Sequence, residues 1–184
     1  MTYEVTEAAA ALIKLCIEKN LTVATAESCT GGLVAGALTE IAGSSAVLDR
    51  GYVTYSNAAK QEMIGVPLAT LKQYGAVSRQ TAEAMARGAL AKSKVDLAVS
   101  ITGIAGPGGG TADKPVGLVH FAAASRAGTS MHAAQRYGDI GRAEVRLKSV
   151  LQALRMLREL AEADAVTKPR RLPKPSTAKG RKKP

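Results

Sequence analysis

The sequence holds few of the residues on which metal sites, disulfide frameworks and aromatic cores depend. In 184 residues there are two histidines, two cysteines, one phenylalanine and no tryptophan. Neither Cys16 nor Cys29 has neighbours at metal-ligand spacing, and two cysteines allow at most one disulfide, so we expect two reduced thiols. The scarcity of large aromatic side chains predicts a core of alanine, valine, leucine and isoleucine.

Long apolar runs are also missing. No stretch approaches the roughly 18 uninterrupted apolar residues of a membrane span. The first residues are polar and include Glu4 and Glu7, which is not typical of a signal peptide. We therefore expect a cytoplasmic protein without membrane contact, long enough for one domain with a proper core.

The net charge of +10 is concentrated at the C-terminal end. Residues 165–184 contain eight lysines or arginines, four prolines and no acidic residue. Without them, 17 basic and 15 acidic residues remain, so residues 1–164 carry only +2. This composition predicts a domain over 1–164 and a disordered basic tail over 165–184. The tail either solubilises the protein or makes a weak, salt-sensitive contact with nucleic acid or another polyanion.

Helical and strand-like patterns alternate along the rest of the chain. Apolar residues at helical spacing predict helices over about 5–20, 33–41, 58–64, 68–74, 79–92 and 142–163. Runs rich in β-forming residues predict strands over about 22–26, 48–55, 96–102, 116–124 and 129–137, the last two forming a hairpin. Asn57 is the expected cap of the third helix. The order predicts a single layered α/β domain, with a mixed, mostly parallel sheet flanked by helices.

One turn between a strand and a helix stands out. The apolar run over 22–26 is followed by a small polar turn, with Ser28 and Thr30 at the bend. Free N–H groups at the start of a helix stabilise negative charge, and Gly31 and Gly32 leave room for a ligand close to the backbone. Ser28 is therefore a candidate nucleophile of a small hydrolase. The alternative is that Ser28 or Thr30 only caps the helix.

Polar residues also lie at the ends of the next two strands. Tyr55 ends one strand, with Lys60 five residues further on, and Thr102 ends the other. Because the carboxyl ends of parallel strands face a common crevice, we expect these residues to lie near Ser28.

A serine nucleophile needs a base, and the histidines are poorly placed to supply one. His120 and His132 fall inside the predicted hairpin strands, away from the crevice. Lysine is then the remaining candidate, and Lys60 would need its pKa lowered from about 10.4 by burial or by a nearby cation. The alternative is that Lys60 is an ordinary exposed lysine.

A glycine-rich loop follows the third predicted strand. It contains Gly103, Gly106, Gly108, Gly109 and Gly110. The loop lacks the Lys-Ser/Thr ending of a P-loop and precedes a strand, so it fits neither nucleotide-binding fingerprint. It either binds phosphate or ribose through backbone N–H groups, with Lys114 close by, or is a flexible surface loop. No His, Cys, Asp or Glu cluster has ligand spacing, so no metal is expected.

Taken together, these segments resemble the CinA C-terminal domain family, the nicotinamide-nucleotide amidohydrolases (NMN deamidases, PncC). The matching segments, in order, are AESCTGG (26–32), IAGSS (41–45), GYVTYSNAAK (51–60), MIGV (63–66), GAVS (75–78), SITGIAGPGGG (100–110) and KPVG (114–117). The resemblance covers residues 5 to 160 and leaves out the tail. It does not extend to the N-terminal domain of full-length CinA proteins, so no activity of that domain is expected.

The resemblance implies hydrolysis of the carboxamide of nicotinamide mononucleotide to nicotinic acid mononucleotide and ammonia, in pyridine nucleotide recycling and without a cofactor. It implies that Ser28 is the nucleophile and Lys60 the base, and that Tyr55 and Thr102 orient or polarise the pair. Backbone N–H groups near Thr30 and Gly31 would hold the oxyanion. The implied substrate-binding residues are Thr30, Gly31, Gly32, Gly103, Gly106, Gly108, Gly109, Lys114 and Arg142.

The chain departs from the family pattern before the last helix. A Gly-Asp-Arg triplet is usual there, whereas here Ile140 and Gly141 separate Gly138-Asp139 from Arg142. The phosphate ligand therefore stays open between Arg142 and Arg146. Family behaviour also suggests a homo-oligomer, a dimer or larger. The rival hypothesis is a non-catalytic nucleotide- or partner-binding module linked to competence or DNA damage.

Overall fold

The computed structural model describes residues 1–163 of the chain. Its helices are α1 (Tyr3–Lys19), α2 (Leu33–Thr39), α3 (Asn57–Ile64), α4 (Leu68–Tyr74), α5 (Arg79–Lys92) and α6 (Arg142–Ala163), with a 3-10 turn η1 (Ser44–Ala46). Its strands are β1 (Val23–Glu27), β2 (Leu48–Val53), β3 (Leu97–Gly103), β4 (Leu118–Ser125) and β5 (Ser130–Arg136). The predictions of a disordered basic tail and of a boundary at residue 164 lie outside the described residues.

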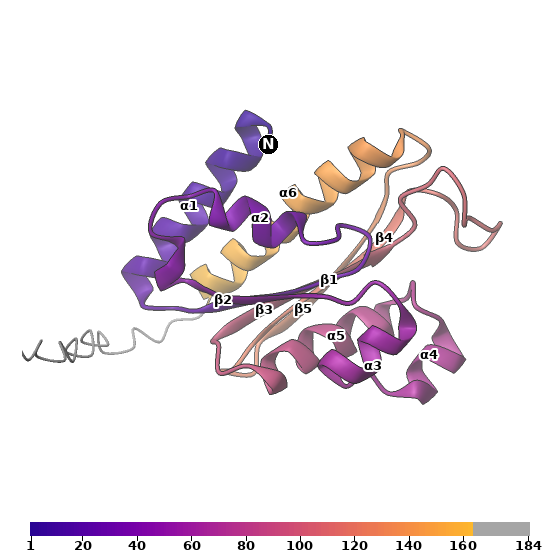
Figure 1. Cartoon of the computed structure of the whole chain (residues 1–184), viewed down its shortest axis with the longest axis horizontal. Helices are drawn as coiled ribbons and strands as arrows, with labels where there is room; N and C mark the ends of the chain where they lie inside the picture. Colours follow the sequence, from indigo (N-terminus) through magenta and orange to yellow (C-terminus); the bar gives the residue numbers. More distant parts are fainter. Residues whose placement is uncertain (164–184) are drawn as a thin grey trace, which may run out of the picture.

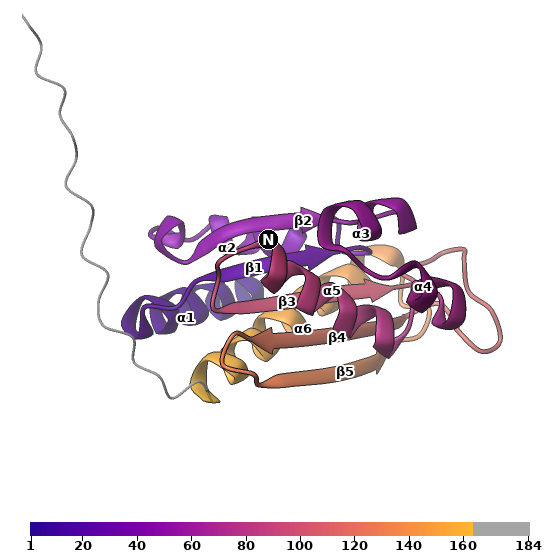
Figure 2. The ribbon, with the colours of Figure 1, turned by 90° about the horizontal axis from the view of Figure 1, so that it is seen from below.

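The strands form one mixed sheet in the order β2-β1-β3-β4-β5 (Figure 2). β1 pairs in parallel with β2 and β3, whereas β4 is antiparallel to both β3 and β5. All residues of β1 are buried, including the polar Thr25 and Glu27. The predicted α/β class, the mixed sheet and the final hairpin are confirmed. Within residues 1–163, no helix is both long enough and apolar enough to cross a membrane.

Helices cover both faces of this sheet (Figure 1). α1, α2 and α6 lie on one face, and α3, α4 and α5 lie on the other. The connections from β1 to β2 and from β2 to β3 run in opposite directions along the sheet, so right-handed crossovers place their helices on opposite faces. The reversal occurs around β1, and ligands of open α/β sheets bind beyond the carboxyl ends of strands at such a point.

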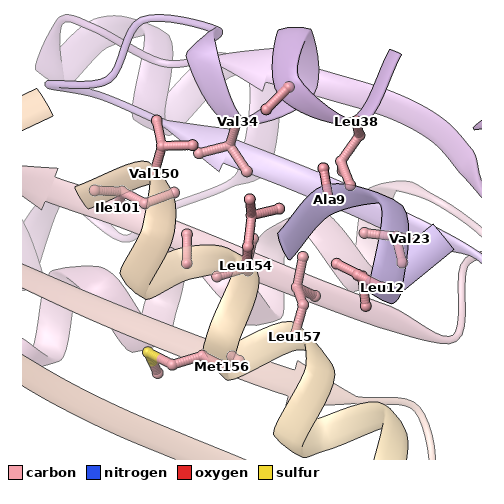
Figure 3. Packing of buried hydrophobic residues seen from close by; sticks show 14 of the residues in the cluster. Ala9, Leu12, Val23, Val34, Leu38, Ile101, Val150, Leu154, Met156 and Leu157 are labelled. Atoms are coloured by element: carbon pink, nitrogen blue, oxygen red, sulfur yellow. The ribbon is translucent and has the colours of Figure 1, made fainter. Parts of the chain in front are cut away.

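The larger part of the core lies between the sheet and α1, α2 and α6. Figure 3 shows Leu12 of α1, Val34 of α2 and both Leu154 and Leu157 of α6 packed over β1 and β3. Burying each such aliphatic side chain contributes roughly 2 kcal/mol, so this layer holds α6 firmly against the sheet. The single phenylalanine, Phe121, belongs to the same cluster, whose other members are overwhelmingly aliphatic, as predicted.

Two predicted boundaries next to the site are wrong. The second strand ends at Val53, so Tyr55 lies in the connection to α3 rather than at the strand's end. The cap of α3 is Ser56 and not Asn57, which is the first residue of the helix. Ser56 has an extended backbone, and its Oγ accepts the N–H of Ala59 at 3.0 Å, as a capping hydroxyl does three residues before its donor.

Candidate active site

The turn after β1 is held by Glu27, the last residue of that strand, whose side chain is fully buried. The carboxylate accepts backbone N–H groups at 3.0, 3.0 and 2.9 Å from, in turn, Gly32, Val34 and Ala35. These N–H groups lie at the start of α2, where the helix itself supplies no partner. Neither Ser28 nor Thr30 makes a side-chain cap of α2, so the structure favours a role for these hydroxyls other than capping.

Lys60 approaches Ser28 from α3. Its side chain is 1% exposed, and its Nζ lies 3.1 Å from the Oγ of Ser28. The same Nζ donates to the carbonyl oxygens of Thr54 at 2.8 Å and Tyr55 at 3.4 Å. A neutral amine has two hydrogens and one lone pair. The protonated amine donates to Ser28 as well as to the carbonyls, and loss of that proton leaves a lone pair for the Ser28 hydroxyl, within the reach of a general base.

Burial changes the acid–base chemistry of both neighbours of Ser28. Removal of the ammonium from water lowers the pKa of Lys60 from 10.5 to about 8, so a useful fraction is neutral near physiological pH. Burial raises the pKa of the Cys29 thiol from 9.0 to about 12. Cys29 therefore stays a protonated thiol, and the hydroxyl of Ser28 is the available nucleophile.

The N–H groups of the turn differ in what they already bind. The N–H of Gly31 donates to the carbonyl of Ser28 at 3.1 Å, and that of Gly32 is held by Glu27. Within residues 1–163, the N–H groups of Cys29 and Thr30 donate to no other residue. The expected oxyanion donor Gly31 is therefore engaged. The backbone N–H groups of Cys29 and Thr30, the two residues after Ser28, are the candidate oxyanion donors.

Arg142 joins two other predicted residues at the rim of the site. Its Nη2 donates to the hydroxyl of Tyr55 at 3.2 Å, and its Nη1 donates to the carbonyl of Gly106 at 3.0 Å. Tyr55 is 60% exposed, and across the described part of the chain its hydroxyl bonds to neither Ser28 nor Lys60. Residues from three separate segments thus meet at the rim, but Tyr55 faces outward and this is not the meeting at Ser28 that the strand-end argument predicted.

Other predicted residues do not join the Ser28–Lys60 pair. The hydroxyl of Thr102 is buried and donates to the carbonyl of Ala76 at 2.8 Å. Nζ of Lys114 donates to the carbonyl of Tyr74 at 2.7 Å, at the end of α4. The binding roles that stay predictions include those of the loop glycines Gly103, Gly106, Gly108 and Gly109.

Sequence reasoning missed Glu27 and the carbonyl of Thr54, and it assigned Arg146 only as an alternative phosphate ligand. Arg146 instead donates from Nε to the carbonyl of Cys29 at 3.1 Å and from Nη2 to that of Thr30 at 3.0 Å. The signal for Glu27 was available, because a carboxylate that ends a buried apolar strand must find donors. No sequence pattern predicts which backbone carbonyl accepts a hydrogen bond from a side chain several residues away.

A surface groove and a pair of histidines are formed by residues other than Ser28 and Lys60. A surface groove of about 510 Å³ between α3, α4 and α5 is lined by residues that include Tyr74, Glu83 and Arg87 and by none of the predicted site residues. Nδ1 of His120 lies 3.1 Å from Nε2 of His132 across β4 and β5, and burial lowers the pKa of His120 to about 4. In the described part of the chain, no group of three or more His, Cys, Asp or Glu residues could hold a metal.

Comparison with solved structures agrees with this architecture. The crystal structure of the competence/damage inducible protein CihA from Agrobacterium tumefaciens superposes with a TM-score of 0.86 at 59% identity, over 87% of this chain and 97% of that one. A CinA superfamily protein from Klebsiella pneumoniae superposes with a TM-score of 0.81 at 34% identity, over 86% and 98% of the two chains.

The sequence relatives differ in name and in how much of their length this chain covers. A protein of Enterobacter agglomerans named nicotinamide-nucleotide amidohydrolase PncC is 56% identical over 133 residues, which cover 72% of this chain and 80% of the relative. A CinA-like protein of Geobacter sulfurreducens is 51% identical over 148 residues, but these cover only 35% of its length. The model of the CinA C-terminal domain matches residues 5–161. The chain therefore belongs to the CinA C-terminal domain family.

Proposed function

We propose that the protein hydrolyses the carboxamide of nicotinamide mononucleotide to nicotinic acid mononucleotide and ammonia, through an acyl-enzyme on Ser28. The observation that carries the proposal is the 3.1 Å approach of the Lys60 amine to the Ser28 hydroxyl, with the lysine pKa lowered to about 8. The name of the PncC relative from Enterobacter agglomerans supports the choice of substrate.

Acylation begins with neutral Lys60. Its lone pair accepts the proton of Ser28 as Oγ attacks the carboxamide carbon. The carbonyl oxygen becomes an oxyanion, which accepts the N–H groups of Cys29 and Thr30, each donor contributing about 3 kcal/mol to transition-state stabilisation. Protonated Lys60 then transfers its proton to the departing nitrogen, so ammonia leaves and a nicotinoyl ester remains on Ser28.

Deacylation repeats these steps with water. Neutral Lys60 takes a proton from the water that attacks the ester, and it returns that proton to Oγ of Ser28 as the carboxylic acid leaves. The phosphate of the nucleotide is assigned to the rim formed by Arg142, Tyr55 and the glycine loop, because the Arg142 guanidinium donates to the Gly106 carbonyl of that loop and to the Tyr55 hydroxyl.

The decisive experiment measures ammonia released from nicotinamide mononucleotide. Wild-type protein should release it, and Ser28→Ala should lower turnover by at least about a thousandfold, because the acyl-enzyme can no longer form. The melting temperature and the affinity for nicotinic acid mononucleotide should stay close to those of the wild type. Ser45→Ala, an exposed serine outside the site, is the matched control and should be fully active.

No ammonia release by well-folded wild-type protein would instead favour a non-catalytic nucleotide- or partner-binding module. That reading draws on the names of relatives called competence-damage inducible. Full activity in Ser28→Ala would overturn the acyl-enzyme mechanism alone.

We also propose that the protein works in the cytoplasm as a homo-oligomer in pyridine nucleotide recycling. A phosphorylated nucleotide substrate is charged and is retained inside cells, which supports this compartment. The exposed apolar side chains of Met63, Leu68 and Tyr74 on α3 and α4 offer a surface for self-association, and sedimentation of the purified protein tests the oligomeric state.

A further inference from the structure

We propose that Arg146 is a positioning residue that builds the oxyanion hole by orienting the peptide groups of the nucleophile turn, residues 28–31. This inference rests on the proposed acyl transfer at Ser28 and deepens it. It assigns to Arg146 a role distinct from that of Arg142 at the rim.

Arg146 makes direct hydrogen bonds to the nucleophile turn. Arg146 projects from α6 and spans two successive carbonyls, with Nε 3.1 Å from the oxygen of Cys29 and Nη2 3.0 Å from that of Thr30. A guanidinium presents its donors in a rigid fork, so it fixes two acceptors relative to one another, which the single ammonium of a lysine does less well. The turn is thereby tied to the helix that packs most closely over β3 and β4 on that face.

The planarity of the peptide bond links each bound carbonyl of the turn to the N–H group of the next residue. In a trans peptide the C=O and the N–H point in opposite directions. The Cys29 carbonyl shares its peptide plane with the N–H of Thr30, so binding that carbonyl to Arg146 turns the Thr30 N–H away from the guanidinium. In the same way, the bond from Gly31 N–H to the carbonyl of Ser28 fixes the N–H of Cys29. Within residues 1–163, neither of these N–H groups donates a hydrogen bond to another residue.

Arg146 and Lys60 come from helices on opposite faces of the sheet. α6 lies on one face of the sheet and α3, which carries Lys60, lies on the other (Figure 1). Because Arg146 reaches the turn from the α6 layer, an N–H turned away from its guanidinium is turned away from that layer, and Lys60 reaches Ser28 from the other. The N–H of the residue after a nucleophilic serine is a usual oxyanion donor on such strand–turn–helix sites. Arg146 extends the hole by a second donor, Thr30.

The test compares variants of the full chain on nicotinamide mononucleotide. Arg146→Met removes the fork while keeping much of the side-chain volume. It should lower kcat by about 10- to 100-fold, less than the loss of a donor outright, since the N–H groups remain but lose their alignment. The KM and the Kd of nicotinic acid mononucleotide should change less than about twofold, because the hole acts on the transition state. Arg155→Met, which removes an exposed arginine of the same helix paired with Glu4, is the control.

Two further variants keep the proposal falsifiable if Arg146→Met folds poorly. Arg146→Lys should recover only part of kcat, and methylguanidinium added to Arg146→Ala should restore activity in a saturable way. Wild-type kcat in any folded Arg146 variant, or a loss confined to KM, would overturn the inference while leaving the Ser28 mechanism intact. Absence of turnover in the wild-type protein would overturn both.

Discussion

Lys60 illustrates how burial turns a common surface residue into a base. A charged ammonium loses hydration when it is enclosed, and only 1% of this side chain is exposed. The carbonyls of Thr54 and Tyr55 hold the amine in place at 2.8 and 3.4 Å. Unlike a carboxylate, these neutral acceptors add no full negative charge, so the pKa still falls to about 8.

This pKa predicts the pH dependence of the reaction. Only the neutral amine can accept the proton of Ser28, and its fraction grows as the pH rises toward about 8. Between pH 6 and 7, kcat/KM for ammonia release should therefore rise about tenfold, between pH 7 and 8 it should rise about fivefold, and it should level off above about pH 9.

Lys60→Ala should be slower by about 100- to 10,000-fold and should lose this dependence. Lys72→Ala, an exposed lysine of α4, should follow the wild-type profile. A wild-type rate that stays flat from pH 6 to 9, or wild-type activity in Lys60→Ala, would contradict a base role for Lys60.

At the scale of elements, α2 shows how a short helix can depend on one side chain outside it. Its N-cap, Gly32, has no side chain to offer, and φ there is +96°. The buried carboxylate of Glu27 takes over the cap with three backbone bonds and also accepts the hydroxyl of Thr25 at 3.1 Å. Glu27 thus ends β1 and caps the first turn of α2, and the turn that carries Ser28 lies between these two elements.

Glu27→Gln should expose this dependence. The amide keeps one acceptor oxygen and turns an NH₂ group toward N–H donors, so buried donors lose their partners. We expect the free energy of unfolding to fall by about 3 kcal/mol, measured by urea denaturation. Glu40→Gln, at the exposed far end of α2, should change it by less than about 0.5 kcal/mol. Equal stability of the two variants would contradict the capping role of Glu27.

For the whole molecule, charge is divided sharply between the domain and the basic tail. Residues 165–184 carry eight basic groups, while residues 1–164 carry a net charge of only +2. All the contacts of the site fall within the described residues, so the tail has no assigned part in the chemistry.

Deletion of residues 165–184 should leave kcat and KM for nicotinamide mononucleotide unchanged. It should abolish weak binding to duplex DNA at low salt, followed by fluorescence anisotropy, because that binding depends on release of counterions by the clustered basic groups. For the full chain, the same binding should weaken steeply between about 50 and 200 mM salt. A large loss of turnover on deletion would mean that the tail reaches the site.

Much of the architecture was predictable because it is encoded by neighbours in the chain. The last helix was predicted over 142–163 and observed as Arg142–Ala163, since a long apolar stripe has one periodicity. The strand end and cap before α3 were missed by one or two residues, because Ser56 and Asn57 are both good caps and only the backbone angles decide between them.

From the sequence alone, the α/β order and the turn with Ser28 followed, because each depends on residue types within a few positions of one another, and Lys60 followed as a candidate once both histidines were assigned to the hairpin. The tertiary structure decided what depends on packing between layers. It brought Lys60 to 3.1 Å from a serine 32 residues away, and it placed Arg146 at the turn and Arg142 at the rim. It also gave the carboxylate of Glu27 its donors. Distances between layers, and the loss of water that shifts a pKa, arise only when helices from both faces close on the sheet.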